Sequence, residues 1–208
     1  MARGRAAGYD EQRDLILARA AALFAQSGYP ATSMNQVAEA CGLSKATLYH
    51  YYRDKYALLV SIAEGHVTLL RALVDEVLAQ GLPPESRLRA LIARIVAEYA
   101  GAQHAHRVLT EDVRFLEPAD RDRVLDQERA VVAGFAAAVG GLRPELQAAS
   151  LSMPMTMLLF GMINWMFTWM KPDGELDYDT LASMVADLFL GGLPAVMPLP
   201  KLAVTSPH

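Results

Sequence analysis

Hydrophobic residues recur at helical spacing along almost the whole chain. In the first predicted helix, over residues 10–27, one face carries Ile16, Ala20, Leu23 and Phe24. No segment alternates apolar and polar residues in the way that a half-buried strand does. The pattern therefore predicts an all-α protein of about nine helices. Besides residues 10–27 and two short helices between residues 33 and 55, the predicted helices cover residues 55–80, 85–100, 107–116, 118–139, 144–170 and 178–190.

The two short helices between residues 33 and 55 are predicted from their end signals. Ser33 and Gln36 fit a capping box at the start of the first helix. Gly42 stands where a residue in the left-handed conformation would end that helix, and Ser44 can cap the next one. The segment thus predicts a helix-turn-helix, and the rest of the chain is interpreted around it.

The second short helix predicts an exposed face that can bind DNA. The face carries a cation, hydroxyls, an imidazole and aromatic edges, and no carboxylate. A helix that enters the major groove needs donors for phosphates and small or polar groups for base edges. These residues could also be ordinary surface aromatics, but the caps, the turn and the donors all agree with DNA contact. The residues on this face are Lys45, Ala46, Thr47, Tyr49, His50 and Tyr51.

The distribution of charge changes the interpretation of the overall balance. The net charge of −4 taken alone argues against a nucleic-acid-binding protein. Residues 1–60, however, hold seven Lys/Arg and five Asp/Glu, a net +2, whereas the remaining 148 residues hold twelve and eighteen, a net −6. A slightly basic N-terminal part on an acidic body is compatible with one face that meets DNA.

The chain carries one cysteine, Cys41, so no intrachain disulfide or cysteine-based metal site can form. Residues 1–14 lack an apolar signal-peptide core and are expected to form a flexible basic arm. Both observations favour a reducing, cytoplasmic location.

Residues 151–170 lack any charge and are long enough to cross a bilayer, although a helix buried between partners has the same composition. Pro154 is expected to kink or break this helix.

The N-terminal part resembles the tetracycline-repressor (TetR) family of bacterial one-component regulators. The resemblance rests on Gly28-Tyr29, Thr32-Ser33, Val37-Ala38, Cys41-Gly42-Leu43-Ser44-Lys45, Thr47-Leu48-Tyr49-His50-Tyr51 and Lys55. It implies a homodimeric repressor that reads double-stranded DNA at a pseudo-palindromic operator and holds a small-molecule inducer in its body. Helices 144–170 and 178–190 would then form the dimer interface. The implied parts are a DNA-binding domain over residues 1–55, a ligand-binding and dimerisation domain over 56–193, and a flexible tail over 194–208.

The resemblance also assigns roles to individual positions. Tyr56 stands where many members carry an acidic residue, which we interpret as a surface change. The long helix over residues 55–80 would link the two domains. The positions that match DNA contacts are Lys45, Thr47, Tyr49, His50, Tyr51 and Lys55, and those that match phosphate contacts are Thr32 and Ser33.

A second, shorter resemblance concerns the inducer. The motif from Gly161 to Trp165, with Trp169 and Pro172-Asp173-Gly174, is similar to that of members that respond to acyl-CoA thioesters. Aromatic residues on such a helix are also common as core packing, and surface arginines are often only solvated. The predicted ligand-binding residues are Tyr99, Arg107, Arg114, Phe135, Asn164, Trp165 and Trp169.

An enzyme is the least favoured class. His104 and His106, with Glu111 and Asp112 nearby, could suggest a metal or hydrolytic site, but two histidines at i and i+2 do not share a helix face. No positioned nucleophile is evident, and we expect no catalytic site, no metal and no cofactor. The alternative function is a small-molecule-binding protein of the same fold that acts as an activator or has no specific DNA binding.

Overall fold

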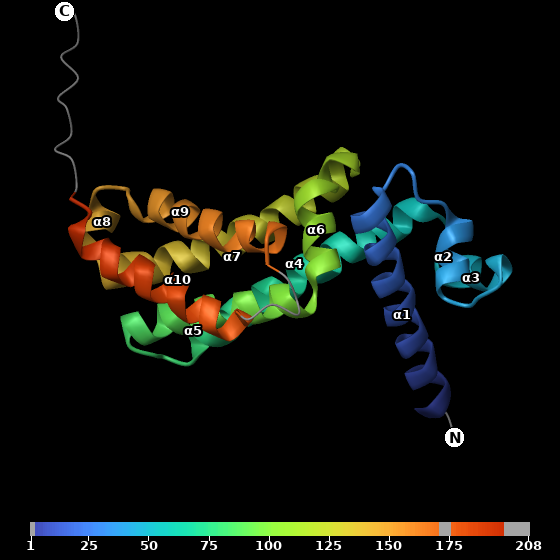
Figure 1. Cartoon of the computed structure of the whole chain (residues 1–208), viewed down its shortest axis with the longest axis horizontal. Helices are drawn as coiled ribbons and strands as arrows, with labels where there is room; N and C mark the ends of the chain where they lie inside the picture. The colour runs from blue at the N-terminus through green and yellow to red at the C-terminus, as the bar shows by residue number, and fades with distance from the viewer. Residues whose placement is uncertain (1–2, 171–175, 198–208) are drawn as a thin grey trace, which may run out of the picture. The chain divides into compact units, whose positions relative to one another are not determined.

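The computed structural model describes residues 3–170 and 176–197, and within them every regular element is helical (Figure 1). This confirms the all-α prediction. The described helices, with their bounds, are α1 (Arg3–Ser27), α2 (Met34–Ala40), α3 (Lys45–Tyr51), α4 (Lys55–Ala79), α5 (Pro84–Gly101), α6 (Gln103–Glu111), α7 (Pro118–Leu142), α8 (Pro144–Ala148), α9 (Ser152–Trp165) and α10 (Tyr178–Gly192), with short 3-10 helices η1 (Val113–Phe115), η2 (Met166–Thr168) and η3 (Leu193–Ala195).

The chain forms two compact units. The first, here called the head unit, comprises residues 1–72 and 98–129, and the second, the body unit, comprises residues 73–97 and 130–208. Helices α4, α5 and α7 each contribute residues to both units. The head unit therefore holds more than the helix-turn-helix, because it also includes α6, η1 and the first part of α7.

The core of the head unit is built on α1, which packs against α2 and α6. Ile16 and Phe24 of α1 are fully buried, as are Val37 of α2 and Leu48 of α3. Helices α2 and α3 have seven residues each, too few to be stable alone in water. Burial of their apolar residues, worth about 1.5–3 kcal/mol for a large side chain, is what holds them in place.

The core of the body unit is built on α5, α7, α9 and α10. The ring of Phe135 on α7 meets Phe160 on α9 edge to face, with centroids 4.9 Å apart. Helix α7 also approaches α4 closely, because a Cβ at Gly134 would lie 2.5 Å from the Val74 Cγ1 atom. Only a glycine permits this approach. The buried residues of α5 that face this core include Leu88, Leu91, Ile92 and Ile95.

The helix predicted over residues 144–170 is broken in its first part, near Pro154 as expected, and its longer part ends at Trp165. Helix α8 ends at Ala148, Ser150 adopts a left-handed conformation (φ 60°), and α9 begins at Ser152. Pro154 lies in the first turn of α9, where proline is tolerated, so the break precedes it. At 14 residues, α9 is too short to cross a bilayer, which takes about 20.

Two other expectations need correction. Helix α1 begins at Arg3, so most of the residues expected to form a flexible arm are helical. The helix predicted over residues 107–116 is α6, which runs from Gln103 to Glu111 and is followed by η1.

Within the described residues, α4 is the one helix long and apolar enough to cross a membrane, and 44% of its most apolar window is buried in the protein.

Candidate DNA-binding and ligand-binding sites

The end signals read from the sequence of α2 and α3 are confirmed. The Ser33 amide donates to Gln36 Oε1 at 2.8 Å, and the Gln36 amide donates to Ser33 Oγ at 3.3 Å, which completes the capping box. Gly42 has a φ of 65°, and Ser44 Oγ accepts from the Thr47 amide at 3.1 Å. The turn between the helices is thus fixed by local bonds.

Helix α3 exposes the face predicted to contact DNA, next to α2 in the head unit (Figure 1). Leu48 and Tyr52 are buried and anchor the helix. The ammonium of Lys45 lies 5.9 Å from the centre of the Tyr49 ring, within the range of a cation–π contact, and both side chains are exposed. The exposed residues of this helix are Lys45, Ala46, Thr47, Tyr49 and His50, with Tyr51 half-buried.

Tyr9 extends this surface, and the sequence analysis missed it. Its ring stacks on Tyr51 with centroids 4.8 Å apart and an interplanar angle of 24°, and 41% of it remains exposed. Four residues along α1, the Arg13 Nε donates to the Tyr52 hydroxyl at 3.0 Å. The prediction of a flexible arm hid this pairing, because Tyr9 meets α3 only when α1 extends toward the N-terminus.

Thr32 is not placed as the resemblance implied. Its side chain is 2% exposed, and its hydroxyl donates to the Gly28 carbonyl at 3.0 Å. It therefore closes the loop between α1 and α2 and offers no exposed hydroxyl to a phosphate. Ser33, the other predicted phosphate contact, is exposed at the start of α2.

Lys55 is already engaged within the head unit. Its ammonium donates to the carbonyls of Tyr29 at 2.7 Å and Pro30 at 3.1 Å, and it lies 4.5 Å from the centre of the Tyr29 ring. Partial burial lowers the pKa of Lys55. The lysine thus ties the start of α4 to the loop that precedes α2, and any phosphate that it binds must share it with these two carbonyls.

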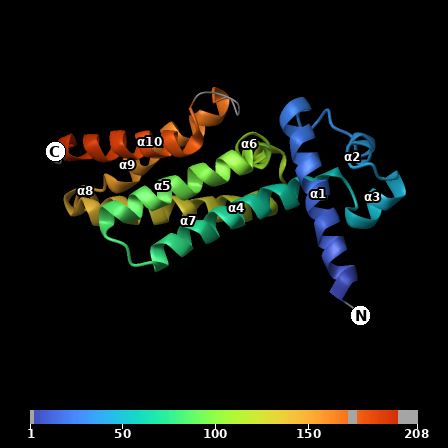
Figure 2. The same ribbon diagram turned by 60° about the horizontal axis from the view of Figure 1, so that its bottom comes forward.

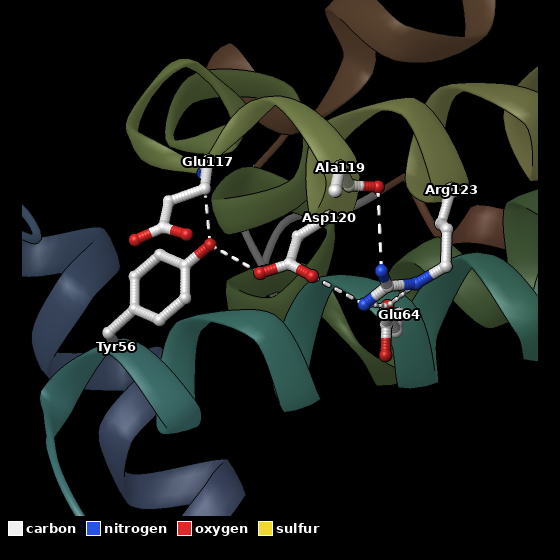
Figure 3. Close-up of polar contacts among 6 residues, drawn as sticks. All are labelled: Tyr56, Glu64, Glu117, Ala119, Asp120 and Arg123. Carbon is white, nitrogen blue, oxygen red and sulfur yellow. Dashed lines mark hydrogen bonds and ion pairs between the residues drawn. The ribbon is translucent and has the colours of Figure 1, made fainter.

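Tyr56, interpreted from the sequence as a surface change, joins a polar network between α4 and α7 (Figure 3). Its hydroxyl donates to Asp120 Oδ2 at 2.5 Å and accepts from the Glu117 amide at 2.9 Å. Asp120 Oδ1 accepts from Arg123 Nη2 at 2.5 Å, and Arg123 Nε donates to Glu64 Oε1 at 2.9 Å. Tyr56 is thus partly exposed, as the surface interpretation expected, but its hydroxyl is engaged in this network.

A buried polar cluster in the head unit brings together residues that the sequence separates. His66 Nε2 lies 3.4 Å from His106 Nδ1, and the Tyr99 ring stacks on His106 with centroids 3.6 Å apart. Burial lowers the pKa of His66 to about 4 and, together with the charge of His66, that of His106 to about 3. Burial also raises the pKa of Tyr99 and of the nearby Glu128 carboxyl. The cluster is therefore held with its imidazoles neutral at pH 7.

The pairing of His104 with His106 does not occur, since His104 is exposed whereas His106 is buried. Over the part of the chain that the structure describes, no group of three or more His, Cys, Asp or Glu side chains is arranged to hold a metal ion. The buried partners of His106 come from α4 and α5, so only tertiary packing reveals them.

The predicted ligand-binding residues are divided between the two units. In the head unit Tyr99 is buried, Arg107 is paired with Glu111 at 3.0 Å, and Arg114 lies over the Phe115 ring. Arg114 also lines an open hollow of about 750 Å³ together with Arg121 and Thr110. The hollow is lined by these two guanidinium groups and by the carboxyl groups of Glu111 and Asp122.

In the body unit the predicted residues fall into two kinds. Phe135 is fully buried and packs on Phe160, so it serves the core. Trp165 and Trp169, by contrast, are 67% and 49% exposed. Asn164 is half-buried, and its Oδ1 has no hydrogen-bond partner among the described residues. The two tryptophans therefore leave a large apolar surface uncovered.

Large apolar side chains also lie exposed along two neighbouring helices of the body unit. Helices α9 and α10 pack side by side (Figures 1 and 2). Several exposed large apolar side chains on two packed helices are typical of a surface that binds a partner. Its members are Met153, Met157, Leu158 and Trp165 on α9 and Met184 and Leu188 on α10, here called the α9–α10 patch.

Comparison with known proteins agrees with this arrangement. Residues 16–62 match the family profile described as bacterial regulatory proteins, tetR family, and residues 81–193 match the tetracyclin repressor-like C-terminal domain. A TetR-family transcriptional regulator from Bordetella parapertussis 12822 has a structure that superposes with a TM-score of 0.83 at 36% identity, covering 89% of this chain and 97% of that one.

Two further relatives are named for a regulatory role or for the molecules that they bind. The HTH-type transcriptional repressor KstR2 of Rhodococcus jostii is 24% identical over 189 residues, 89% of this chain and 93% of that protein. The structure of AibR in complex with isovaleryl coenzyme A and operator DNA matches with a TM-score of 0.71 at 25% identity, covering 85% of this chain and 97% of that one.

A capped α2, a glycine turn and an exposed α3 without carboxylates define a helix-turn-helix DNA-binding protein. With both domains matched by their profiles, the chain belongs to the TetR family of bacterial transcriptional regulators.

Proposed function

We propose that this protein is a homodimeric, ligand-responsive repressor that binds a pseudo-palindromic operator in the cytoplasm and releases it when a small hydrophobic inducer binds. The observation that carries the proposal is the exposed face of α3, which presents Lys45, Thr47, Tyr49 and His50 without a competing carboxylate. Two such helices in a dimer would enter successive major grooves roughly 34–36 Å apart.

The α9–α10 patch supports the homodimer. A two-fold interface joins the same surface on both subunits, so a self-complementary apolar patch on two helices suits it. Leu158 and Leu188 are 63% and 68% exposed, and a second copy of the chain would cover both. The described residues 152–165 of α9 carry no charge, as expected of an interface core.

The inducer class is proposed as an acyl-CoA thioester. The support is the motif Gly161 to Trp165 with Trp169, together with the AibR relative, whose structure holds isovaleryl coenzyme A. Arg114 and Arg121 at the hollow in the head unit could meet the phosphates of such a ligand. Ligand and operator binding would be reciprocally linked, and a hundredfold release needs about 2.7 kcal/mol of coupling.

The experiment is a selection of bound sequences from a random double-stranded DNA library with the purified protein. Enrichment of an inverted repeat whose half-sites are about 10 base pairs apart supports the proposal. The selected DNA is then challenged with isovaleryl-CoA, a long-chain acyl-CoA, an aromatic acyl-CoA and free CoA as the control. Failure to enrich any sequence contradicts specific operator binding and favours the alternative, a small-molecule-binding protein without specific DNA binding.

Regulation by activation is separated from repression by a promoter assay. A reporter carrying the selected operator is transcribed in vitro with and without the protein. Lower transcription with the protein, restored by an acyl-CoA, supports repression. Higher transcription with the protein would identify an activator.

A further inference from the structure

Tyr56 holds the first turn of α4 against the start of α7 (Figure 3). Its hydroxyl uses both of its hydrogen-bonding capacities there, since it donates to the Asp120 carboxylate at 2.5 Å and accepts from the Glu117 amide at 2.9 Å. The bond to a carboxylate is charge-assisted and is stronger than a neutral one. The hydroxyl therefore joins the first turn of α4 to the start of α7 by two hydrogen bonds.

The other polar links between α4 and α7 in the head unit are more exposed. Arg123 bridges Asp120 and Glu64, but its side chain is 58% exposed, and exposed ion pairs contribute little. Farther along the two helices, Arg71 Nη1 donates to Gln127 Oε1 at 2.9 Å, also in an exposed position. Tyr56 is half-buried, and its hydroxyl is the first of the causes that lower the pKa of Asp120. Of these polar links, the tyrosine is thus expected to contribute most to holding the start of α7 against α4.

The neighbouring residues of the same turn hold the helix-turn-helix. Lys55 donates to the Tyr29 and Pro30 carbonyls in the loop before α2, and Asp54 Oδ1 accepts from the Ala57 amide at 2.7 Å to cap α4. Adjacent residues on a helix point about 100° apart, so one turn can bind two neighbours. Residues 54–56 therefore connect the loop before α2 with the start of α7, all within the head unit.

We propose that Tyr56 is a positioning residue for operator recognition. Its hydroxyl fixes where the helix-turn-helix lies relative to the start of α7. The inference rests on the proposed function. Tyr56 itself lies outside the residues predicted to touch DNA, and it acts through Lys55 and the loop before α2. Loss of the hydroxyl leaves the reading face of α3 intact but less well placed.

The test compares Tyr56→Phe with Glu64→Gln. The first variant removes only the hydroxyl, and the second breaks the exposed Arg123–Glu64 pair while leaving Tyr56 in place. Circular dichroism and thermal unfolding establish that each variant is folded, and Asp120→Asn is a second way to weaken the same bond. Amide hydrogen exchange should be about tenfold faster at Glu117 in Tyr56→Phe, because that amide loses its acceptor. In Glu64→Gln it should be unchanged.

The position of the helix-turn-helix is measured by pulsed electron resonance. Nitroxides are placed at Glu39→Cys on α2 and Asp126→Cys on α7 in a Cys41→Ala background, and the labelled protein is diluted with unlabelled protein so that distances within one chain are seen. The unmodified Tyr56 protein should give one narrow distance distribution, and Tyr56→Phe a broader or shifted one. Operator affinity of Tyr56→Phe should then fall threefold to tenfold.

Two outcomes overturn the proposal. One is a Tyr56→Phe protein whose exchange at Glu117 and whose distance distribution match the parent. The other is a Glu64→Gln protein that changes both as much as Tyr56→Phe does. Neither measurement uses DNA or an inducer, so a failure of the parent protein to bind any operator would count against the proposed function and leave this test intact.

Discussion

The clearest consequence of the α9–α10 patch is that one charge at Leu158 should separate the subunits of the proposed dimer. Leu158 is 63% exposed, and covering a leucine contributes about 1.5–3 kcal/mol. Two-fold symmetry places this residue in the interface twice, which gives about 3 kcal/mol when the lower figure is taken for a side chain already partly covered. Leu158→Asp removes that term and adds the cost of burying two carboxylates.

At 1.4 kcal/mol for each factor of ten, the dimer Kd should rise at least about a hundredfold. Sedimentation velocity over a range of protein concentrations measures it. Leu69→Asp is the matched control, because Leu69 is also an exposed leucine, 43% exposed, but lies on α4 outside the patch. A Leu158→Asp protein that dimerises as tightly as the parent would refute the assignment. Equal dissociation of both variants would show that the patch has no special role.

Three other predictions concern the head unit. Tyr49→Ala, which removes an exposed ring from α3, should weaken operator binding about tenfold or more and leave the dimer intact, as measured by anisotropy; unchanged affinity would exclude this residue from the reading face. Tyr9→Ala removes the stack on Tyr51 and should weaken operator binding several-fold, whereas Tyr9→Phe, which keeps the stack, should bind as the parent does. Burial lowers the pKa of His66 from 6.5 to about 4, so as the pH falls the unfolded state takes up a proton at this imidazole before the folded state does. The contribution of His66 to the free energy of unfolding is therefore present above pH 6.5 and is lost as the pH falls towards 4. Between pH 7 and pH 5 the free energy of unfolding should drop by about 2 kcal/mol because of this residue. Urea unfolding of the parent and of His66→Leu at both pH values checks this, and an identical pH dependence in the two proteins would contradict it.

The helix-turn-helix could be read from the sequence because its signals are local. The bonds of Ser33 to Gln36 and of Ser44 to Thr47 join residues three apart, and Gly42 acts through its own backbone. Such features need no knowledge of distant contacts. For the same reason the buried and exposed sides of α3 follow from the position of Leu48 alone.

The remaining features depend on pairings that a single sequence does not display. Tyr56 meets Asp120 across 64 residues, and His66 meets His106 across 40. Thr32 was matched to a phosphate contact by its position, but its hydroxyl finds the Gly28 carbonyl once the loop closes. Pro154 indicated a break in the helix predicted over residues 144–170, but no charge or glycine around Ser150 marked where the break lies.

The measurement that tests the central claim most directly is a fluorescence-anisotropy titration of the protein against its selected operator. It is run at two salt concentrations, with a scrambled DNA of the same length as the control and with acyl-CoAs added at the end. The account predicts tight binding to the operator, weaker binding to the scrambled DNA, a fall in affinity with salt, and release by one acyl-CoA class. Equal affinity for the operator and the scrambled DNA would contradict it.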